Sequence, residues 1–89
     1  MTLSEEIAKN LPKIENLLSK DTLKAFAQTP EDLLGKYLAG LGTVVRLKLL
    51  CDHNALYRAF LKEGFTDRDE MTLIILREFR KHLLARPSP

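Results

Sequence analysis

Apolar residues recur along most of the chain at steps of three and four residues, which is the period of an amphipathic α-helix. The first such run consists of Leu3, Ile7, Leu11, Ile14 and Leu18. Ser4 is a suitable N-cap, so this run predicts a helix that begins at Ser4 and is kinked or split at Pro12, which lacks a backbone donor. The turn Ser19-Lys20-Asp21 then predicts a short second helix capped by Asp21.

The middle third of the chain carries the clearest helix start, Thr29-Pro30-Glu31-Asp32. Thr is a good N-cap, Pro fits the first helical position, and the two acids stabilise the positive end of the helix dipole. At about 100° per residue, eight apolar side chains fall on one broad face, with no change of phase at the glycines: Leu33, Leu34, Tyr37, Leu38, Leu41, Val44, Val45 and Leu49. The pattern therefore predicts one helix from Pro30 to Leu50, with a break at Gly40–Gly42 as the alternative.

Two further helices are predicted in the C-terminal third of the chain. Asp52 is expected to cap the first of them and Gly64 to end it. Thr66 is expected to cap the second, which spans Asp67 to Ala85 with acids at its start and bases at its end. Its apolar residues extend so far around the helix that we expect it to lie at the centre of the domain or to be shared with a second subunit.

These elements predict an all-α protein, a compact bundle of four to five helices dominated by those at 30–50 and 67–85. The 89 residues suffice for one domain, which we place at 1–85, and the two prolines of 86–89 predict a disordered tail. Lys and Arg total 14 against 12 Asp and Glu, and this net charge of +2 is weaker than the clustered excess of a dedicated nucleic-acid binder. The single cysteine excludes an internal disulfide, and no apolar stretch without a charge approaches the roughly 20 residues that a membrane-spanning helix needs, so we expect a soluble cytoplasmic protein with no membrane span.

One flank of the predicted 30–50 helix carries Gly35, Ala39, Gly42 and Arg46, which lie along one stripe at steps of four, three and four residues. Three small residues leading to a guanidinium would form a shallow groove with a charge at its end. Two interpretations are open. The stripe can be a close contact between helices, with Arg46 reaching solvent or an acidic side chain. Alternatively, the groove admits a ligand or partner segment whose carboxylate or phosphate Arg46 binds.

The segment Cys51-Asp52-His53 places three potential metal ligands together at a helix junction. Zinc sites use about four ligands, and the only other histidine is His82. We therefore expect no metal, no cofactor and no catalytic Cys–His pair. His53 is expected to lie partly buried on the apolar side of its helix, and Cys51 to be a small buried hydrophobic residue.

Three short motifs follow one another along residues 30–84. They are Gly40-Leu41-Gly42-Thr43-Val44-Val45-Arg46, then Asn54-Ala55-Leu56 with Phe60, then Asp69-Glu70-Met71-Thr72 with Ile75. Together they resemble a family of small bacterial domains of unknown function with a Gly-Leu-Gly-x-x-Ile-Arg-Asn core, a later Asn-x-x-Leu and an Asp-Asp-x-Ser-x-x-Ile start to the last helix. This chain has Leu38 and Leu47 where that family has a histidine and an asparagine. The resemblance implies no activity, and it points to Gly42, Arg46 and Asn54 as positions to test.

We therefore expect a non-enzymatic regulatory or protein-interaction module that acts through a helical surface and forms a homo-oligomer. The candidate partner-binding or ligand-binding residues are Gly35, Gly42, Arg46, His53 and Asn54. A first alternative is a protein that binds a small anion, such as a nucleotide or phosphate, in the glycine-lined groove with Arg46. A second alternative is a weak nucleic-acid binder that uses the basic residues of the last helix, Arg77, Arg80 and Lys81.

Overall fold

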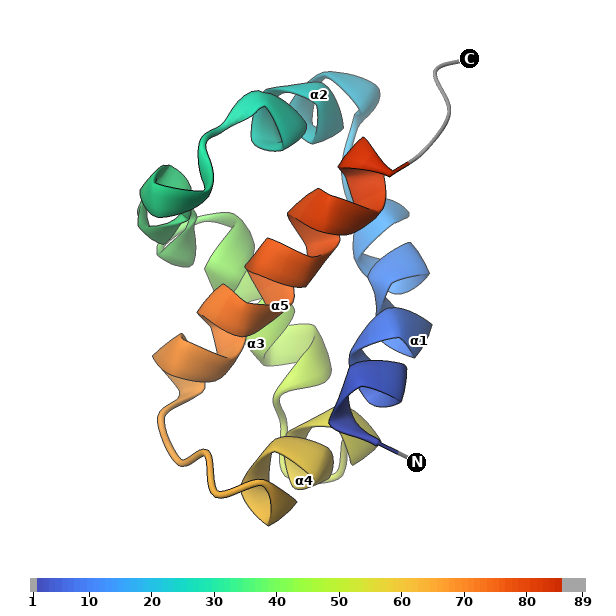
Figure 1. Cartoon of the computed structure of the whole chain (residues 1–89), viewed down its shortest axis with the longest axis vertical. Coiled ribbons are helices and arrows are strands. Elements are labelled where there is room, and N and C mark those ends of the chain that lie inside the picture. The colour runs from blue at the N-terminus through green and yellow to red at the C-terminus, as the bar shows by residue number, and fades with distance from the viewer. Residues whose placement is uncertain (1, 86–89) are drawn as a thin grey trace.

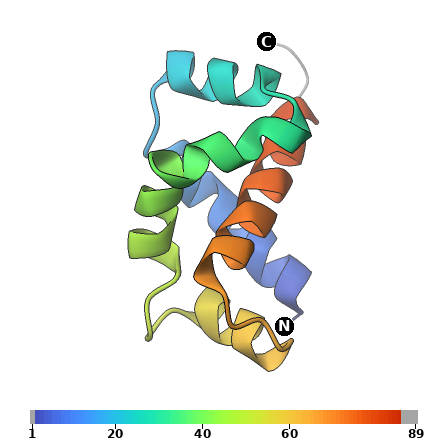
Figure 2. The same ribbon diagram turned by 90° about the vertical axis from the view of Figure 1, so that its left-hand side faces the viewer.

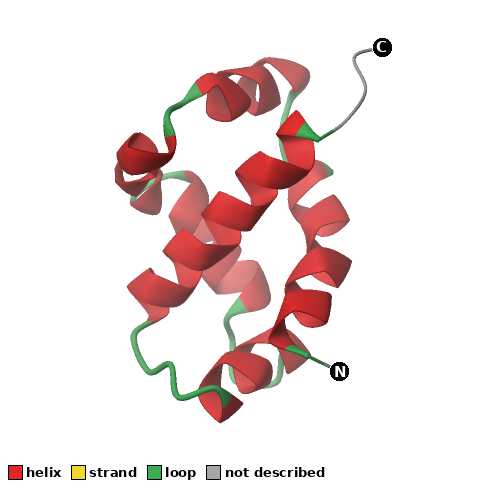
Figure 3. Ribbon diagram, viewed as in Figure 1, coloured by secondary structure: helices red, strands yellow, loops and turns green. Residues whose placement is uncertain are grey.

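Helices account for every regular element of residues 2–85, the range that the structure, a computed structural model, describes. They are α1 (Leu3–Glu15), α2 (Lys20–Gln28), the 3₁₀-helix η1 (Glu31–Leu38), α3 (Leu41–Leu49), α4 (Ala55–Lys62) and α5 (Arg68–Leu84). Short loops join them, and no strand lies in the described range (Figure 3). The predicted all-α bundle is confirmed, with six helices in place of four or five, and the tail predicted at 86–89 lies outside the described residues. None of the helices between residues 2 and 85 combines the length and apolarity needed to cross a bilayer.

α5 is the central helix of the bundle. It runs diagonally across the molecule and is contacted by α1, α2, η1 and α3 (Figure 1). Its buried residues are Met71, Thr72, Ile75, Leu76 and Phe79. The ring of Phe79 packs against that of Phe26 from α2, with the ring centroids 5.4 Å apart. The sequence left two explanations for the many apolar residues of this helix, a central position or an interface with a second subunit. The structure shows the central position.

α1 is one helix, although Pro12 lies inside it. A capping box at its start joins the Thr2 hydroxyl to the Glu5 backbone N–H and the Glu5 carboxylate to the Thr2 backbone N–H. The buried face of α1 packs against α4 and α5. Pro12 does not split the helix, because it removes one hydrogen bond on the exposed side of an element that its cap and its packing hold together.

The prediction of a single helix from Pro30 to Leu50 is wrong. Its first half is the 3₁₀-helix η1, and α3 starts only after Gly40, whose φ of −100° and ψ of −92° belong to neither kind of helix. Figure 2 shows η1 lying across the molecule while α3 runs down its side. The chain therefore turns at Gly40–Gly42, which is the alternative that the sequence left open.

Close approach of three helices explains why a glycine is needed at this turn. Gly42 is buried, and a Cβ at this position would lie 3.0 Å from the backbone oxygen of Tyr37 and 3.3 Å from Cγ2 of Thr72. The start of α3 thus rests directly on both η1 and α5, and a side chain would push them apart. A 3₁₀-helix also has about 3.0 residues per turn, so an apolar phase computed at about 100° per residue does not continue through η1.

Four helix caps lie one or two residues from the predicted ones, and at α1 the cap is Thr2 in place of the predicted Ser4. The residues that accept backbone N–H groups at the starts of the other three helices, α2, α4 and α5, are Ser19, Asn54 and Asp67, in place of the predicted Asp21, Asp52 and Thr66. Thr29 does not cap η1, because its buried hydroxyl bonds the Ala25 carbonyl and the Tyr37 hydroxyl. Gly64, with a φ of 93°, follows the end of α4 as predicted.

Candidate functional site

The predicted glycine stripe does not form one surface, because it is divided between η1 and α3. Gly35 lies on η1 and is exposed, with no atom within 4 Å of a Cβ built there. Gly42 is buried where α3 meets η1 and α5. Of the two interpretations of the stripe, close contact between helices describes Gly42.

Arg46 projects from the outer side of α3 and forms an ion pair. Its Nη1 donates to Oδ1 of Asp69, at the start of α5, over 3.1 Å. The two side chains remain 44% and 57% exposed, so solvent screens the pair and its contribution to stability is small. A guanidinium carries five donors, and this bond uses one of them. Arg46 is therefore accessible to a further partner.

A shallow hollow of about 300 Å³ opens beside Arg46, and we call it the α3 hollow. Its lining residues are Arg46, Leu47, Leu50, Cys51, Asp52 and Arg68. Arg68 donates from Nη2 to Oδ1 of Asp52 over 3.3 Å, and its guanidinium carbon lies 4.7 Å from the centroid of the Tyr57 ring. The buried Nε of Arg68 has no hydrogen-bond partner among the described residues. The hollow thus has a second Arg–Asp pair beside that of Arg46.

Leu47 gives the α3 hollow its apolar character, because this residue is 72% exposed. Val44, one turn earlier on the same side of α3, is 38% exposed. The two guanidiniums and the two carboxylates lie around this apolar surface. The arrangement offers an apolar contact and charges of both signs to an incoming surface.

The segment Cys51-Asp52-His53 forms the turn between α3 and α4, and its three side chains are exposed. The expectation that Cys51 and His53 are buried is wrong, because α4 begins only at Ala55 and the segment precedes its apolar face. Asn54 is the N-cap of α4, and its side-chain oxygen accepts the backbone N–H of Leu56 over 2.8 Å. Within residues 2–85, no three His, Cys, Asp or Glu side chains gather as metal ligands would.

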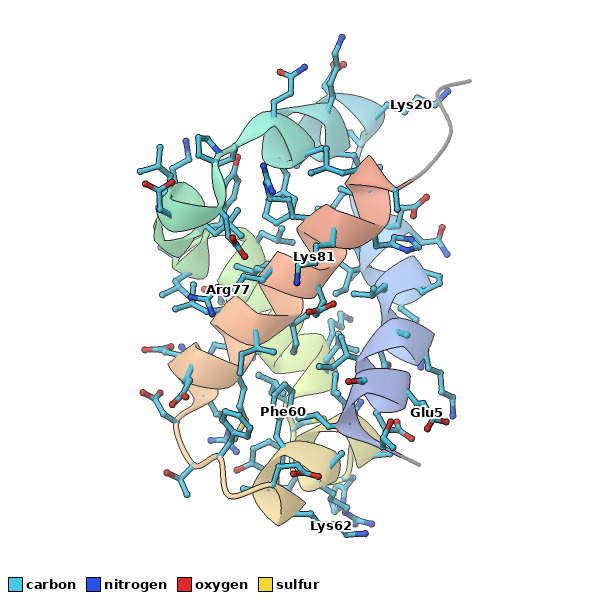
Figure 4. The ribbon with its side chains drawn as sticks, in the orientation of Figure 1. Glu5, Lys20, Phe60, Lys62, Arg77 and Lys81 are labelled. Atoms are coloured by element: carbon cyan, nitrogen blue, oxygen red, sulfur yellow. The ribbon has the colours of Figure 1, made fainter. Side chains whose placement is uncertain are left out.

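The three basic residues predicted as a contact surface on α5 have different surroundings. Arg80 donates from Nε to the backbone oxygen of Thr29 over 2.6 Å, which ties α5 to the end of α2. Lys81 pairs with Glu78 at 3.5 Å, and Arg77 is exposed. Figure 4 shows Arg77 and Lys81 on the outward side of α5, whereas the ring of Phe60 on α4 lies in the core.

The region that holds these residues matches a known family. The sequence model of a family described as Domain of unknown function (DUF6794) matches residues 5–83. The chain belongs to this family. The DUF6794 match runs from α1 to the last turn of α5, so it includes the N-terminal helix that the resemblance over 30–84 leaves out. Membership of a family of unknown function is confirmed, while a bacterial origin and a Gly-Leu-Gly core stay predictions. No curated protein and no solved structure matched the chain.

The sequence pattern did not single out Leu47 or Arg68. Leu47 lies two positions from both Val45 and Leu49, which places it about 200° from each and therefore opposite the buried face. This angular position could have identified Leu47 from the sequence, because an apolar residue on the outer side of a helix is exposed. No sequence feature could have identified Arg68 in the same way. Its partner Asp52 lies in the turn between α3 and α4, whereas Arg68 begins α5.

Proposed function

We propose that this DUF6794 chain is a non-enzymatic protein-interaction module that pairs with a second copy of itself through the α3 hollow. The observation that carries the proposal is Leu47, an apolar side chain left 72% exposed beside two Arg–Asp pairs. A leucine in water forgoes the roughly 1.5–3 kcal/mol that full burial would provide. A second copy of the chain is a ready partner for this surface, because every copy of the protein in solution carries it.

The charges of the α3 hollow favour a second copy over a partner of one charge sign. A two-fold interface brings one surface together with itself, so each charge needs its opposite on that same surface. The hollow is lined by two guanidiniums and the carboxylate of Asp52, and Asp69 adds a second carboxylate through its pair with Arg46, which lets Arg46 of one copy face Asp52 of the other. An apolar centre with a polar surround is also the arrangement of interface hot spots.

The two alternative functions have less support. A small anion in the α3 hollow would meet the carboxylate of Asp52, and it would have to share the two arginines with Asp52 and Asp69, which already bind them. Nucleic acid at the basic end of α5 would compete with Thr29 for Arg80 and with Glu78 for Lys81. A stabilising shift with phosphate or nucleotide would restore the first alternative, and strongly salt-dependent binding of DNA would restore the second.

Light scattering over a concentration series tests the proposed pairing. The wild-type chain is expected to pass from monomer to dimer as its concentration rises into the tens of micromolar. Leu47→Asp places a charge at the apolar centre and is expected to remain monomeric over the same range. Leu33→Asp is the matched control, because Leu33 on η1 is 51% exposed and does not line the hollow. The control is expected to pair like the wild type.

Two results would contradict the pairing. One is a wild-type chain that stays monomeric at every concentration, and the other is an equal loss of dimer in both aspartate variants. Circular dichroism melting curves should show that both variants are folded, because neither leucine belongs to the buried core. If Leu33→Asp alone abolished the dimer, η1 would be the interface in place of α3.

A further inference from the structure

A second surface lies on the other side of α3, where three adjoining hollows follow α1. The first hollow, of about 230 Å³, opens between α1 and α3. Its apolar lining residues are Ile14, Leu17, Val45 and Leu49. Leu17 is 48% exposed, whereas the other three are buried and form a floor. Lys13 from α1 and Lys48 from α3 flank this apolar floor.

The other two hollows continue the first along α1 toward α4. The second, of about 200 Å³, shares Lys13 and Asn54 with the first. The third, of about 270 Å³, shares Glu6, His53 and Ala55 with the second. Because neighbouring hollows share lining residues, the three form one trough, which we call the α1 groove. It has no lining residue in common with the α3 hollow.

The α1 groove concentrates positive charge. Its cationic lining residues are Lys9, Lys13, Lys48, Arg58 and Lys62. None of these five forms an ion pair with another described residue, whereas Arg46, Arg68 and Lys81 each do. The acids along the groove are Glu6 and Glu63. A chain whose formal net charge is only +2 therefore holds a set of unneutralised cations along one side.

Glu6 adds an acceptor inside the groove. The residue lines the second and third hollows and is 8% exposed as a whole, and its carboxylate has no hydrogen bond or ion pair among the described residues. A carboxylate that faces an open groove without a partner suits an N–H donor supplied by an occupant. An extended peptide supplies backbone N–H groups, and its side chains alternate in direction, so the same segment can present carboxylates to the lysines.

We infer that the α1 groove binds an acidic peptide segment of another protein through one apolar anchor. The anchor occupies the first hollow between Lys13 and Lys48, and the carboxylates that follow it lie along Lys9 and Arg58. Nucleic acid matches this groove less well, because His53 is the one residue with a ring among its described lining residues, and stacking of successive bases needs several rings. The apolar floor at one end also offers nothing to a phosphate backbone.

Fluorescence anisotropy at low salt, with a labelled peptide of sequence Leu-Asp-Glu-Asp-Glu, tests the inference. The double variant Lys13→Glu with Lys48→Glu is expected to raise the Kd about tenfold, because two attractive contacts become repulsive. The control is Lys20→Glu with Lys24→Glu, which makes the same change in net charge at exposed lysines of α2. The control is expected to bind the peptide like the wild type.

Any of four results would overturn the inference. The first is the absence of saturable binding of the peptide to the wild type. The second is an equal loss in the two double variants, which would make the effect one of net charge. The third is unchanged affinity for a peptide with serine in place of leucine, which would remove the anchor. The fourth is tighter binding of a single-stranded oligonucleotide of equal charge, which would assign the groove to nucleic acid.

Two single variants separate this groove from the α3 hollow and from effects on folding. Leu17→Asp changes an exposed side chain of the first hollow, so it is expected to keep the fold and to weaken binding of the peptide. Leu47→Asp lies outside the groove and is expected to bind the peptide like the wild type. Peptide binding and self-association can therefore fail independently. Equal affinity of wild type and Leu17→Asp would contradict an anchor in the first hollow.

Discussion

α5 and α3 are both apolar helices, but the bundle covers them to different extents. α5 has 17 residues and is contacted by four other helices, and Met71, Ile75 and Phe79 have no exposed surface. α3 has nine residues and packs mainly against α5 and η1. Its outer side leaves Val44 and Leu47 in solvent.

This difference shows that apolar content alone does not identify a binding surface. α5 carries apolar residues around much of its circumference because neighbouring helices cover it from several directions. α3 has neighbours on one side, so an apolar residue on its other side stays exposed. The number of covering elements decides which helix presents apolar surface, and tertiary structure sets that number.

Truncation of one buried and one exposed side chain is the strongest test of this comparison. Phe79→Ala removes a fully buried ring that packs against Phe26, and we expect it to lower the free energy of unfolding by about 3–5 kcal/mol. Leu47→Ala is expected to change this free energy by less than about 0.5 kcal/mol. Urea unfolding followed by circular dichroism compares the two variants. A loss at Leu47 as large as that at Phe79 would mean that α3 is covered on both sides.

Substitution of two glycines tests the contact that joins α3 to its neighbours. Gly42→Ala adds a methyl group 3.0 Å from the backbone oxygen of Tyr37, which cannot yield unless η1 moves. Overpacking costs roughly 1–3 kcal/mol, and the better helix propensity of alanine offsets up to about 1 kcal/mol of it. We therefore expect a net loss of about 1 kcal/mol.

Gly35→Ala is the matched control, because a Cβ on this exposed glycine of η1 meets no atom within 4 Å. It is expected to raise the free energy of unfolding by about 0.4–1 kcal/mol through the unfolded state. Thermal melts of the two variants should therefore shift in opposite directions. A stabilised Gly42→Ala would show that α3 does not press on η1.

The sequence was sufficient for the helical class and for the limits of its longest helix. The apolar period and the charge polarity predicted a helix over 67–85, and α5 spans Arg68–Leu84. The caps were less well determined, because two or three residues able to cap stand near each helix start. Asp52 and Asn54, for example, are both good caps, and only the direction of the chain after α3 makes Asn54 the one that accepts an N–H.

The sequence pattern could not predict the turn at Gly40, because tertiary contacts cause this turn. The apolar phase runs unbroken through Gly40 and Gly42, so periodicity alone favours one helix. What divides it is the contact of α3 with η1 and α5, in which Gly42 lies against Tyr37 and Thr72. Contacts between distant segments leave no local periodic signal.

Of the candidate site, the sequence predicted one residue, Arg46, but not the shape of the surface around it. One interpretation of Arg46 had it reach solvent or an acidic side chain, and the structure shows both, with Asp69 as the acid. The groove expected beside it is absent because Gly35 and Gly42 belong to different helices. The α3 hollow lies there in its place, and one of its lining residues is Arg68, the first residue of α5, which is distant from α3 in the sequence.

The smallest expected effect compares Arg46 on α3 with Arg77 on α5, since both side chains are exposed. Arg46→Ala removes a solvent-screened ion pair worth at most about 1 kcal/mol, so we expect the melting temperature to fall by no more than about 4–8 °C. Arg77→Ala is expected to change it less.

Self-association should distinguish the two arginines where thermal stability does not. Arg46→Ala removes a charge that faces Asp52 of the second copy in the proposed dimer, so the dimer should dissociate at a higher concentration than in the wild type. Arg77→Ala should leave that concentration unchanged, because Arg77 lies outside the α3 hollow. Light scattering and melting curves on the same samples measure both quantities. A large fall in melting temperature would give Arg46 a structural role, and an unchanged dimer would separate it from the interface.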